Sequence, residues 1–286
     1  MVDAIGATYR VPGVPRPEVS IVIVTYEGSG VVGQALRSLL ENTEPCYELI
    51  VIDNGSSDAT PALLRQVDNA TIVLNERNHG FGAANNQGAS RARGRYLVFL
   101  NQDAFVHSGW LPPLLERIES DDRIGAVGPM LLNPDGSLQC AGAVLSRSGS
   151  TAGYGEGEHP ERPEYRNARV VDYLPGACLL VRRRAFDDVG GFDAAYGLAY
   201  FEDADLALAL AAHGYLSMYE PSSSVTHVRG TPSEALLRLA RRNRALFERR
   251  WRQVLASRPL SPLAANGPRV PAVHDAPARS LDSLPT

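Results

Sequence analysis

The feature that most constrains the fold is a regular alternation of apolar, β-branched runs with helical segments over the first hundred residues. Residues 19–25 form the first such run, which is typical of a strand buried on both faces. Further strands are expected at residues 48–53, 71–75 and 95–101, and helices at 31–41, 59–67 and 82–93. Strands that alternate with helices of this length predict an α/β fold, with a Rossmann-like, mostly parallel central sheet flanked by helices.

Polar residues gather where these expected strands end. Thr25, Asp53, Asn75 and Asn101 each close one of them. Open α/β sheets bind ligands in the crevice at the carboxyl ends of their strands. The alternation therefore predicts a ligand site at this edge of the sheet before any motif is considered.

The composition argues against several classes of protein. The 286 residues include 28 basic and 32 acidic ones, a net charge of −4, which does not favour a nucleic-acid binder. Every basic residue is Arg, so neither Schiff-base lysine chemistry nor a P-loop lysine is available.

No apolar run is long enough for a membrane span, and the first ten residues lack a secretory signal layout. We therefore expect a cytoplasmic protein, whose only membrane contact would be peripheral and at the inner face. The three cysteines show neither disulfide nor metal-ligand spacing.

The second half is less regular and predicts a smaller, less uniform subregion. Strands are expected at residues 124–130, 137–145, 170–181 (interrupted at Pro175-Gly176), 215–219 and 224–228, with helices at 111–119, 202–213 and 234–251 and a long loop at 149–166. Residues 1–17 are expected to be a loose leader, and residues 256–286 a disordered, Pro-rich tail.

Two acidic strand ends are candidate ligand sites. Asp103 can hold a hard divalent cation if substrate phosphates supply further ligands, and the alternative is a turn aspartate bonded to its own backbone. Asp53 follows the first strand–helix–strand unit, where an acid suits a pair of ribose hydroxyls. Asp58 is expected to cap the helix that follows it.

A glycine-containing loop, residues 78–86, enters the third helix, whose N-terminus could face an anionic diphosphate. A dinucleotide fingerprint should instead follow the first strand, but residues 25–30 there lack its third glycine. This departure counts against an NAD dehydrogenase and against a sugar-phosphate nucleotidyltransferase.

Three acids open the helix expected at residues 202–213. Glu202 and Asp205 fit simple interaction with the helix dipole, whereas the same helix end would also hold Asp203 ionised and ready to accept a proton. The preceding loop, residues 190–197, contains glycines and aromatics of the kind that shape a pocket.

His227, at a strand end, is either a hydrogen-bonded structural residue or a metal ligand.

Residues 234–252 combine seven arginines with an apolar stripe at helical spacing. One interpretation is contact with anionic phospholipid or a lipid diphosphate. The other, which we favour, is an amphipathic helix packed on the domain with a solvated arginine face.

In order and spacing, these segments resemble family 2 glycosyltransferases with the GT-A fold, especially the rhamnosyltransferase-like bacterial members. The resemblance runs from about residue 19 to residue 251. It rests on VSIVIVTY (19–26), VIDNGSSD (51–58), NHGFGAANNQG (78–88), YLVFLNQD (96–103), PGACLLVRR (175–183), GGFD (190–193) and FEDADL (201–206). Each motif is modest alone, and their joint order is specific.

The resemblance implies a role for each matching position. The donor, a nucleotide-diphosphate sugar of the dTDP-rhamnose or UDP-hexose type, would be held by Thr25, Glu27, Asp53, Asn78, Gly82, Asn86, Gln102 and Asp103. Asp103 and His227 would hold Mg²⁺ or Mn²⁺, and Asp203 would be the catalytic base. The acceptor side would be lined by Gly176, Ala177, Phe192 and Glu202. Residues 18–104 would form the nucleotide-sugar-binding half, and residues 105–255 the acceptor-binding half.

The implied activity is metal-dependent, inverting hexosyl transfer to a hydroxyl of a glycan, lipid-linked or small-molecule acceptor, as in cell-wall or polysaccharide biosynthesis. Three residues depart from the family pattern. Asn101 replaces the first carboxylate of the metal motif, Glu27 stands where Asn is usual, and Ala209 stands where many members have Arg. Asn101 and Ala209 leave open an alternative, a catalytically inactive GT-A-fold protein that binds sugar nucleotides.

Overall fold

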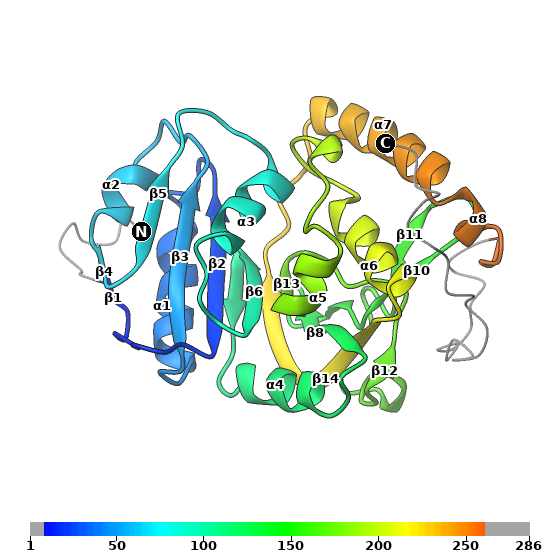
Figure 1. Ribbon diagram of the computed structural model, residues 1–286, viewed down its shortest axis with the longest axis horizontal. Coiled ribbons are helices and arrows are strands. Elements are labelled where there is room, and N and C mark those ends of the chain that lie inside the picture. Colours follow the sequence, from blue (N-terminus) through cyan, green and yellow to red (C-terminus); the bar gives the residue numbers. More distant parts are fainter. Residues whose placement is uncertain (1–8, 261–286) are drawn as a thin grey trace.

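The computed structural model describes residues 9–260 (Figure 1). Its strands are β1 (Tyr9–Arg10), β2 (Val19–Thr25), β3 (Tyr47–Asp53), β4 (Val67–Asp68), β5 (Thr71–Leu74), β6 (Tyr96–Asn101), β7 (Ala104–Val106), β8 (Ile124–Leu132), β9 (Leu138–Cys140), β10 (Ala143–Leu145), β11 (Thr151–Gly153), β12 (Arg169–Val170), β13 (Cys178–Arg182) and β14 (Leu216–His227). Its α-helices are α1 (Val32–Asn42), α2 (Thr60–Leu64), α3 (Phe81–Ala89), α4 (Leu111–Glu119), α5 (Arg183–Asp188), α6 (Glu202–Ala212), α7 (Glu234–Arg250) and α8 (Arg252–Leu255).

One sheet runs through both halves of the molecule, in the order β12-β14-β8-β13-β6-β2-β3-β5. Strands β6, β2, β3 and β5 are parallel, as are β8 and β14, whereas β13 lies antiparallel between β6 and β8. The register places Thr25 opposite Asp53, and Val24 opposite Asn101. The expected polar strand ends therefore meet at one edge, and the predicted GT-A-like, mostly parallel sheet is confirmed.

Helices cover the sheet on both faces because the strands are apolar on both. Along β2, Ile21 and Ile23 pack in the cluster that includes Leu36 of α1, whereas Val22 packs in the opposite cluster with Ala84 of α3. The second cluster also contains Leu206 of α6, the helix that begins with Glu202. The core thus anchors the elements whose ends form the site.

Several expected boundaries are wrong. The strands expected at residues 215–219 and 224–228 are one strand, β14, with a register irregularity between Glu220 and Ser224. The strand expected at 137–145 is broken into β9 and β10 around Gly142, whose φ is +82°. The helix expected at 59–67 ends at Leu64, and Val67 lies in β4. The loop expected at 149–166 contains β11.

The leader is packed where the structure describes it. Tyr9 and Arg10 pair in parallel with β4, and Val11 is fully buried in the core. The expectation of a loose segment is therefore wrong for residues 9–11, since their apolar side chains complete the cluster around α1. Residues 1–8, and the part of the expected tail from residue 261 to 286, lie outside the described residues. Within residues 9–260, no helix is long and apolar enough to cross a bilayer.

Candidate active site

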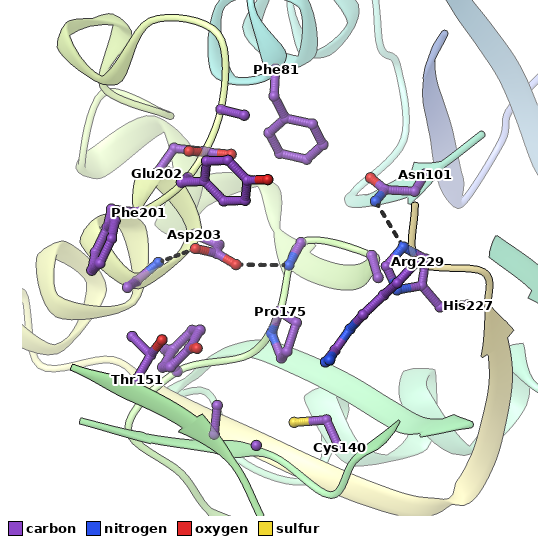
Figure 2. Close-up of a pocket in the computed structure, with 18 of the residues that line it drawn as sticks. Phe81, Asn101, Cys140, Thr151, Pro175, Phe201, Glu202, Asp203, His227 and Arg229 are labelled. Atoms are coloured by element: carbon purple, nitrogen blue, oxygen red, sulfur yellow. Dashed lines mark hydrogen bonds between the residues drawn. The ribbon is translucent and has the colours of Figure 1, made fainter. Parts of the chain in front are cut away.

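A pocket of about 370 Å³ brings together side chains from distant parts of the chain (Figure 2). Asn101 at the end of β6 and His227 at the end of β14 line one part of it, and Glu202 and Asp203 at the start of α6 line another. The other lining residues include Phe81, Gln139, Cys140, Thr151, Tyr173, Pro175, Gly176, Ala177, Tyr200, Phe201 and Arg229. The pocket therefore joins the expected base to Asn101 and His227, whereas Asp103 of the expected metal motif is not among its lining residues.

Asp203 is held by the backbone. One carboxylate oxygen accepts a hydrogen bond from Ala204 N at 2.8 Å, and the other accepts one from Gly176 N at 3.1 Å. Burial raises the pKa of Asp203, and the backbone hydrogen bonds oppose this shift without cancelling it. The helix end, which was expected to hold the carboxyl ionised, is thus outweighed by burial in its effect on the pKa. The raised pKa makes the carboxylate a stronger proton acceptor.

Glu202, the neighbour of Asp203, is 7% exposed, and its Oε2 has no hydrogen-bond partner among the described residues. Burial raises the pKa of Glu202, and the adjacent charge of Asp203 raises it further. Backbone hydrogen bonds from Tyr200 and Glu202 oppose this shift without cancelling it, so the buried carboxyl favours its protonated form. The pair therefore favours one ionised and one protonated acid, with a free polar atom at the pocket wall.

The expected metal ligands converge on His227. Its Nε2 lies 3.4 Å from Asp103 Oδ1 and 3.4 Å from Asn101 Nδ2. Its Nδ1 lies 2.8 Å from Oε1 of Gln139, a buried residue on β9 that sequence analysis missed. Because an amide oxygen can only accept, Nδ1 donates to Gln139, and the lone pair of Nε2 is left to accept from Asn101 Nδ2, beside Asp103 Oδ1.

This arrangement fits a divalent cation. An imidazole lone pair and a carboxylate oxygen 3.4 Å apart can share one ion, and the hydrogen bond from Nδ1 to Gln139 is the kind of outer contact that orients a metal-binding histidine. Within residues 9–260, no cluster of three or more His, Cys, Asp and Glu side chains forms a cation site. A cation here would need the phosphate oxygens of a substrate to complete its coordination.

Arg229 supplies a positively charged group that sequence analysis did not single out. Its side chain lines the pocket, 50% exposed, and donates to Glu156 on the loop after β11 at 2.6 Å. Figure 2 shows it extending past His227 toward Pro175. The pocket therefore has a guanidinium on the same side as the metal motif.

The residues expected to bind the nucleoside lie along the adjoining strand ends, outside this pocket. Thr25 Oγ1 donates to Gln102 Oε1 at 2.6 Å, and Tyr26 N donates to the same oxygen at 3.0 Å. Asp53 accepts from Ser56 Oγ at 2.5 Å and is 2% exposed. Glu27 accepts from the backbone and the hydroxyl of Ser57, both at 2.9 Å. Together, these hydrogen-bonded side chains form a row from the end of β6 to the end of β3, which we call the polar ledge.

Asn78 belongs to a network of amides that holds the loop before α3. Its Oδ1 accepts from Gly80 N and from Asn54 Nδ2, both at 2.8 Å. Asn54, 2% exposed, was not singled out from the sequence. At Gly80, whose φ is +90°, a Cβ would lie 2.0 Å from the carbonyl oxygen of Gly197. The loop glycine is therefore needed for close packing of α3 against the segment that precedes α6.

Two expected donor-binding residues, Asn86 and Gly82, lie close to one expected acceptor residue, Phe192, and outside the lining of the pocket. Asn86 exchanges hydrogen bonds of 2.7 and 2.9 Å with the backbone of Phe192, so its amide joins α3 to the 190–197 loop. A Cβ on Gly82 would lie 3.1 Å from Phe192, which is 2% exposed in a cluster of phenylalanines. None of these three lines the pocket, whereas Gly176, Ala177 and Glu202 do.

Helix α7 braces the segment that leads into α6. Tyr200 and Phe201 both have φ of +75°, a strained conformation for residues with side chains. The buried Asn243 of α7 donates to the carbonyl oxygens of Tyr196, Ala199 and Tyr200 at 2.6, 2.8 and 3.2 Å. Hydrogen bonds from α7, which lies outside the pocket, therefore hold the turn that leads to Glu202 and Asp203.

A second link joins α7 to α6. Asp205, 4% exposed, accepts hydrogen bonds from Tyr196 Oη at 2.8 Å and Trp251 Nε1 at 2.7 Å, and lies 3.3 Å from Arg250 Nη1. Arg250, at the end of α7, thus places a guanidinium beside this buried carboxylate of α6.

Comparison with known proteins agrees with this geometry. Residues 20–190 match the sequence profile described as Glycosyl transferase family 2. An N-acetylglucosaminyl-diphospho-decaprenol L-rhamnosyltransferase of Mycobacterium tuberculosis is 34% identical over 230 residues, 72% of this chain and 75% of that protein. The O-antigen biosynthesis protein RfbC of Myxococcus xanthus is 32% identical over 216 residues, 72% of this chain and 17% of that protein.

Solved structures share the fold at low identity. GalNAc-T7, solved with UDP, GalNAc and Mn²⁺, superposes with a TM-score of 0.68 at 19% identity, over 83% of this chain and 49% of that one. The mannosyltransferase PcManGT of Pyrobaculum calidifontis, solved with GDP-Man and Mn²⁺, gives a TM-score of 0.57 at 19% identity, over 82% of this chain and 64% of that one. The sequence profile, the relatives and the shared fold together show that this chain belongs to glycosyl transferase family 2.

Proposed function

We propose that this protein transfers a sugar, with inversion, from a nucleotide-diphosphate donor to a hydroxyl group of an acceptor. The observation that supports this most strongly is that Asp203 lines the same pocket as Asn101 and His227. An inverting displacement needs a proton acceptor behind the sugar and positive charge at the leaving diphosphate. Three segments of the chain bring a carboxylate, an amide and an imidazole to a single cavity, which supports this proposal.

In this mechanism, Asp203 accepts the proton of the acceptor hydroxyl as its oxygen attacks the anomeric carbon. The backbone N–H groups of Gly176 and Ala204 hold the carboxylate in place. A divalent cation bound by Asp103 and His227 would supply positive charge against the leaving diphosphate. Arg229 places a further positive charge on that side, and the polar ledge from Gln102 to Asp53 would hold the nucleoside.

The donor is proposed to be of the dTDP-rhamnose or UDP-hexose type, and the acceptor to be lipid-linked. Support comes from the relative that is 34% identical, because its name specifies a rhamnosyl donor group and a decaprenol-linked acceptor. A lipid-linked acceptor would place the reaction at the inner face of a membrane. Mg²⁺ and Mn²⁺ both suit a carboxylate combined with phosphate oxygens.

The proposal is tested by thermal denaturation with dTDP, UDP or GDP, each with and without Mn²⁺. A ligand that binds the folded state raises the melting temperature. We expect at least one nucleotide to stabilise the wild type strongly only when Mn²⁺ is present, and His227→Ala to lose that extra shift. His159→Ala, a change at an exposed histidine away from the pocket, is the control.

A second assay separates transfer from binding. Nuclear magnetic resonance of the product should show an anomeric configuration opposite to that of the donor. Retained configuration would contradict the assignment of Asp203 as the base in a single displacement. Nucleotide-sugar binding without transfer to any acceptor would instead favour the inactive binding protein that Asn101 leaves open.

A further inference from the structure

Helices α7 and α8 present a continuous basic surface to solvent. The inner side of α7 is packed, since Asn243 and Phe247 are fully buried. Figure 1 shows both helices along the outside of the fold. We define the arginine face as Arg238, Arg241, Arg242, Arg249 and Arg252. Within α7, spacing of three or four residues bridged by the exposed Ala245 places the first four along one side, and Arg252 of α8 lines the same pocket as Arg249.

Most of the charge on this face is uncompensated. Of the seven arginines between residues 234 and 252, Arg244 pairs with Glu248, and Arg250 pairs inward with Asp193 and Asp205. Arg238 pairs with Glu234. Within residues 9–260, Arg241, Arg249 and Arg252 have no ion-pair or hydrogen-bond partner, and Arg242 contacts only the neighbouring amide of Asn243. Four positive charges therefore face outward without a carboxylate.

A pocket of about 480 Å³ lies at the C-terminal end of the arginine face. Arg147 joins Arg249 and Arg252 in lining it, with Glu248 as its acidic member. Three guanidinium groups around one hollow can hold a phosphate group through charge-assisted hydrogen bonds. The surface thus combines several exposed positive charges with a pocket large enough for a phospholipid headgroup.

Exposed aliphatic side chains lie on the same two helices and just beyond them. Leu237 on α7 is 44% exposed, Val254 on α8 is 38% exposed, and Leu260 just beyond is 77% exposed. Water-exposed aliphatic groups among arginines suit the boundary between headgroups and acyl chains. A polyanion such as a nucleic acid would use the arginines but would leave these apolar groups in water.

The arginine face borders the rim of the active-site pocket. A Cβ placed on Gly197 would lie 4.0 Å from Arg242 Nη1. The residues that follow, Leu198 and Tyr200, are 49% and 36% exposed, and Tyr200 lines the pocket. Asn243, the neighbour of Arg242, binds the carbonyl of Tyr200. A surface that docked on α7 would therefore lie beside the pocket opening.

We propose that the arginine face docks this protein on a bilayer of anionic phospholipid, with Leu237, Val254 and Leu260 entering the headgroup region. The inference rests on exposed charge and apolar area and does not need the proposed sugar transfer, although it would bring the pocket to a lipid-linked acceptor. Vesicle binding and sugar transfer can therefore fail independently of one another.

The test is cosedimentation of the full-length protein with sucrose-loaded vesicles. One set contains phosphatidylcholine alone and the other contains 30% phosphatidylglycerol, both at about 0.1 M salt. We expect at least about tenfold stronger binding to the anionic vesicles, falling steeply at 0.5 M NaCl. Arg241→Gln combined with Arg249→Gln should weaken binding by about 25-fold, or about fivefold for each arginine.

The matched control is Arg10→Gln with Arg184→Gln, which removes the same charge from exposed sites outside the face. This control should bind as the wild type does, and both double variants should transfer sugar to a soluble acceptor at the wild-type rate. Absence of vesicle binding, equal binding to both vesicle sets, or equal loss in the two double variants would overturn the proposal. The second result would indicate apolar adsorption, and the third a general charge effect.

Discussion

Truncation of Asn243 tests how the turn that leads to Asp203 is held. Its side chain is fully buried, and its two amide N–H groups serve three backbone carbonyls, those of Tyr196, Ala199 and Tyr200. A net contribution of about 1–1.5 kcal/mol per hydrogen bond, with carbonyls left unpaired, predicts that Asn243→Ala lowers the free energy of unfolding by about 2–4 kcal/mol. For a chain of this size, that loss lowers the melting temperature by roughly 4–16 °C.

The same change should affect catalysis beyond its effect on stability. Tyr200 and Phe201 hold left-handed backbone conformations that cost about 1–3 kcal/mol each. Without Asn243 the turn can relax, and Asp203 at the start of α6 loses its fixed position. We expect kcat to fall at least about tenfold in fully folded protein, with donor affinity unchanged.

The assay is urea unfolding followed by circular dichroism, together with steady-state kinetics at a temperature where the variant is folded. Asn42→Ala is the control, because this half-buried amide also donates to two carbonyls, those of Ser38 and Val106, but lies on α1. Removal of the Asn42 amide should leave kcat unchanged. An Asn243→Ala protein with stability within about 0.5 kcal/mol of wild type and full kcat would refute this account of the turn.

Two further predictions concern the pocket walls. The pKa of Glu202 is raised by burial, so the folded state keeps a proton that the unfolded state releases, and the free energy of unfolding should fall as pH rises from 5 to 8. Glu202→Gln should flatten that fall in urea titrations, and an unchanged pH dependence would contradict the assignment. Gln139→Leu removes the acceptor for His227 Nδ1 and should weaken Mn²⁺ binding, measured by electron paramagnetic resonance with nucleotide present, by about tenfold or more. Gln139→Glu keeps an acceptor and should bind more tightly than the leucine variant, whereas wild-type affinity in the leucine variant would show that this contact does not orient the histidine.

Local patterns predicted the elements that are apolar on a regular period. The strand expected at residues 19–25 and the helix expected at 111–119 have the observed bounds. Errors occurred where tertiary packing overrides local signals. Tyr9 and Val11 carry no period, yet they fill a gap beside α1. The strand β14 continues through its register irregularity because β8 and β7 supply partners that its own sequence does not reveal.

The site was predictable as a set of motifs but not as a set of contacts. Asp203 and His227 stand at expected element ends and were selected because they match family motifs, and the structure brings both to one pocket. Asn86 belonged to one of the motifs that resemble the family, yet its amide is used by the backbone of Phe192, 106 residues away. Gln139 and Asn243 escaped notice because an isolated amide has no sequence signature, and its partners lie 88 and 43 to 47 residues distant.

The most direct test of the central claim compares Asp203→Asn with the wild type. The asparagine keeps the size of the side chain but cannot accept the proton of the attacking hydroxyl. We predict that donor affinity, measured by calorimetry with Mn²⁺, stays within about threefold, while the rate of sugar transfer falls by about 10²–10⁴-fold. Transfer by Asp203→Asn at the wild-type rate would contradict the assignment of this carboxylate as the base.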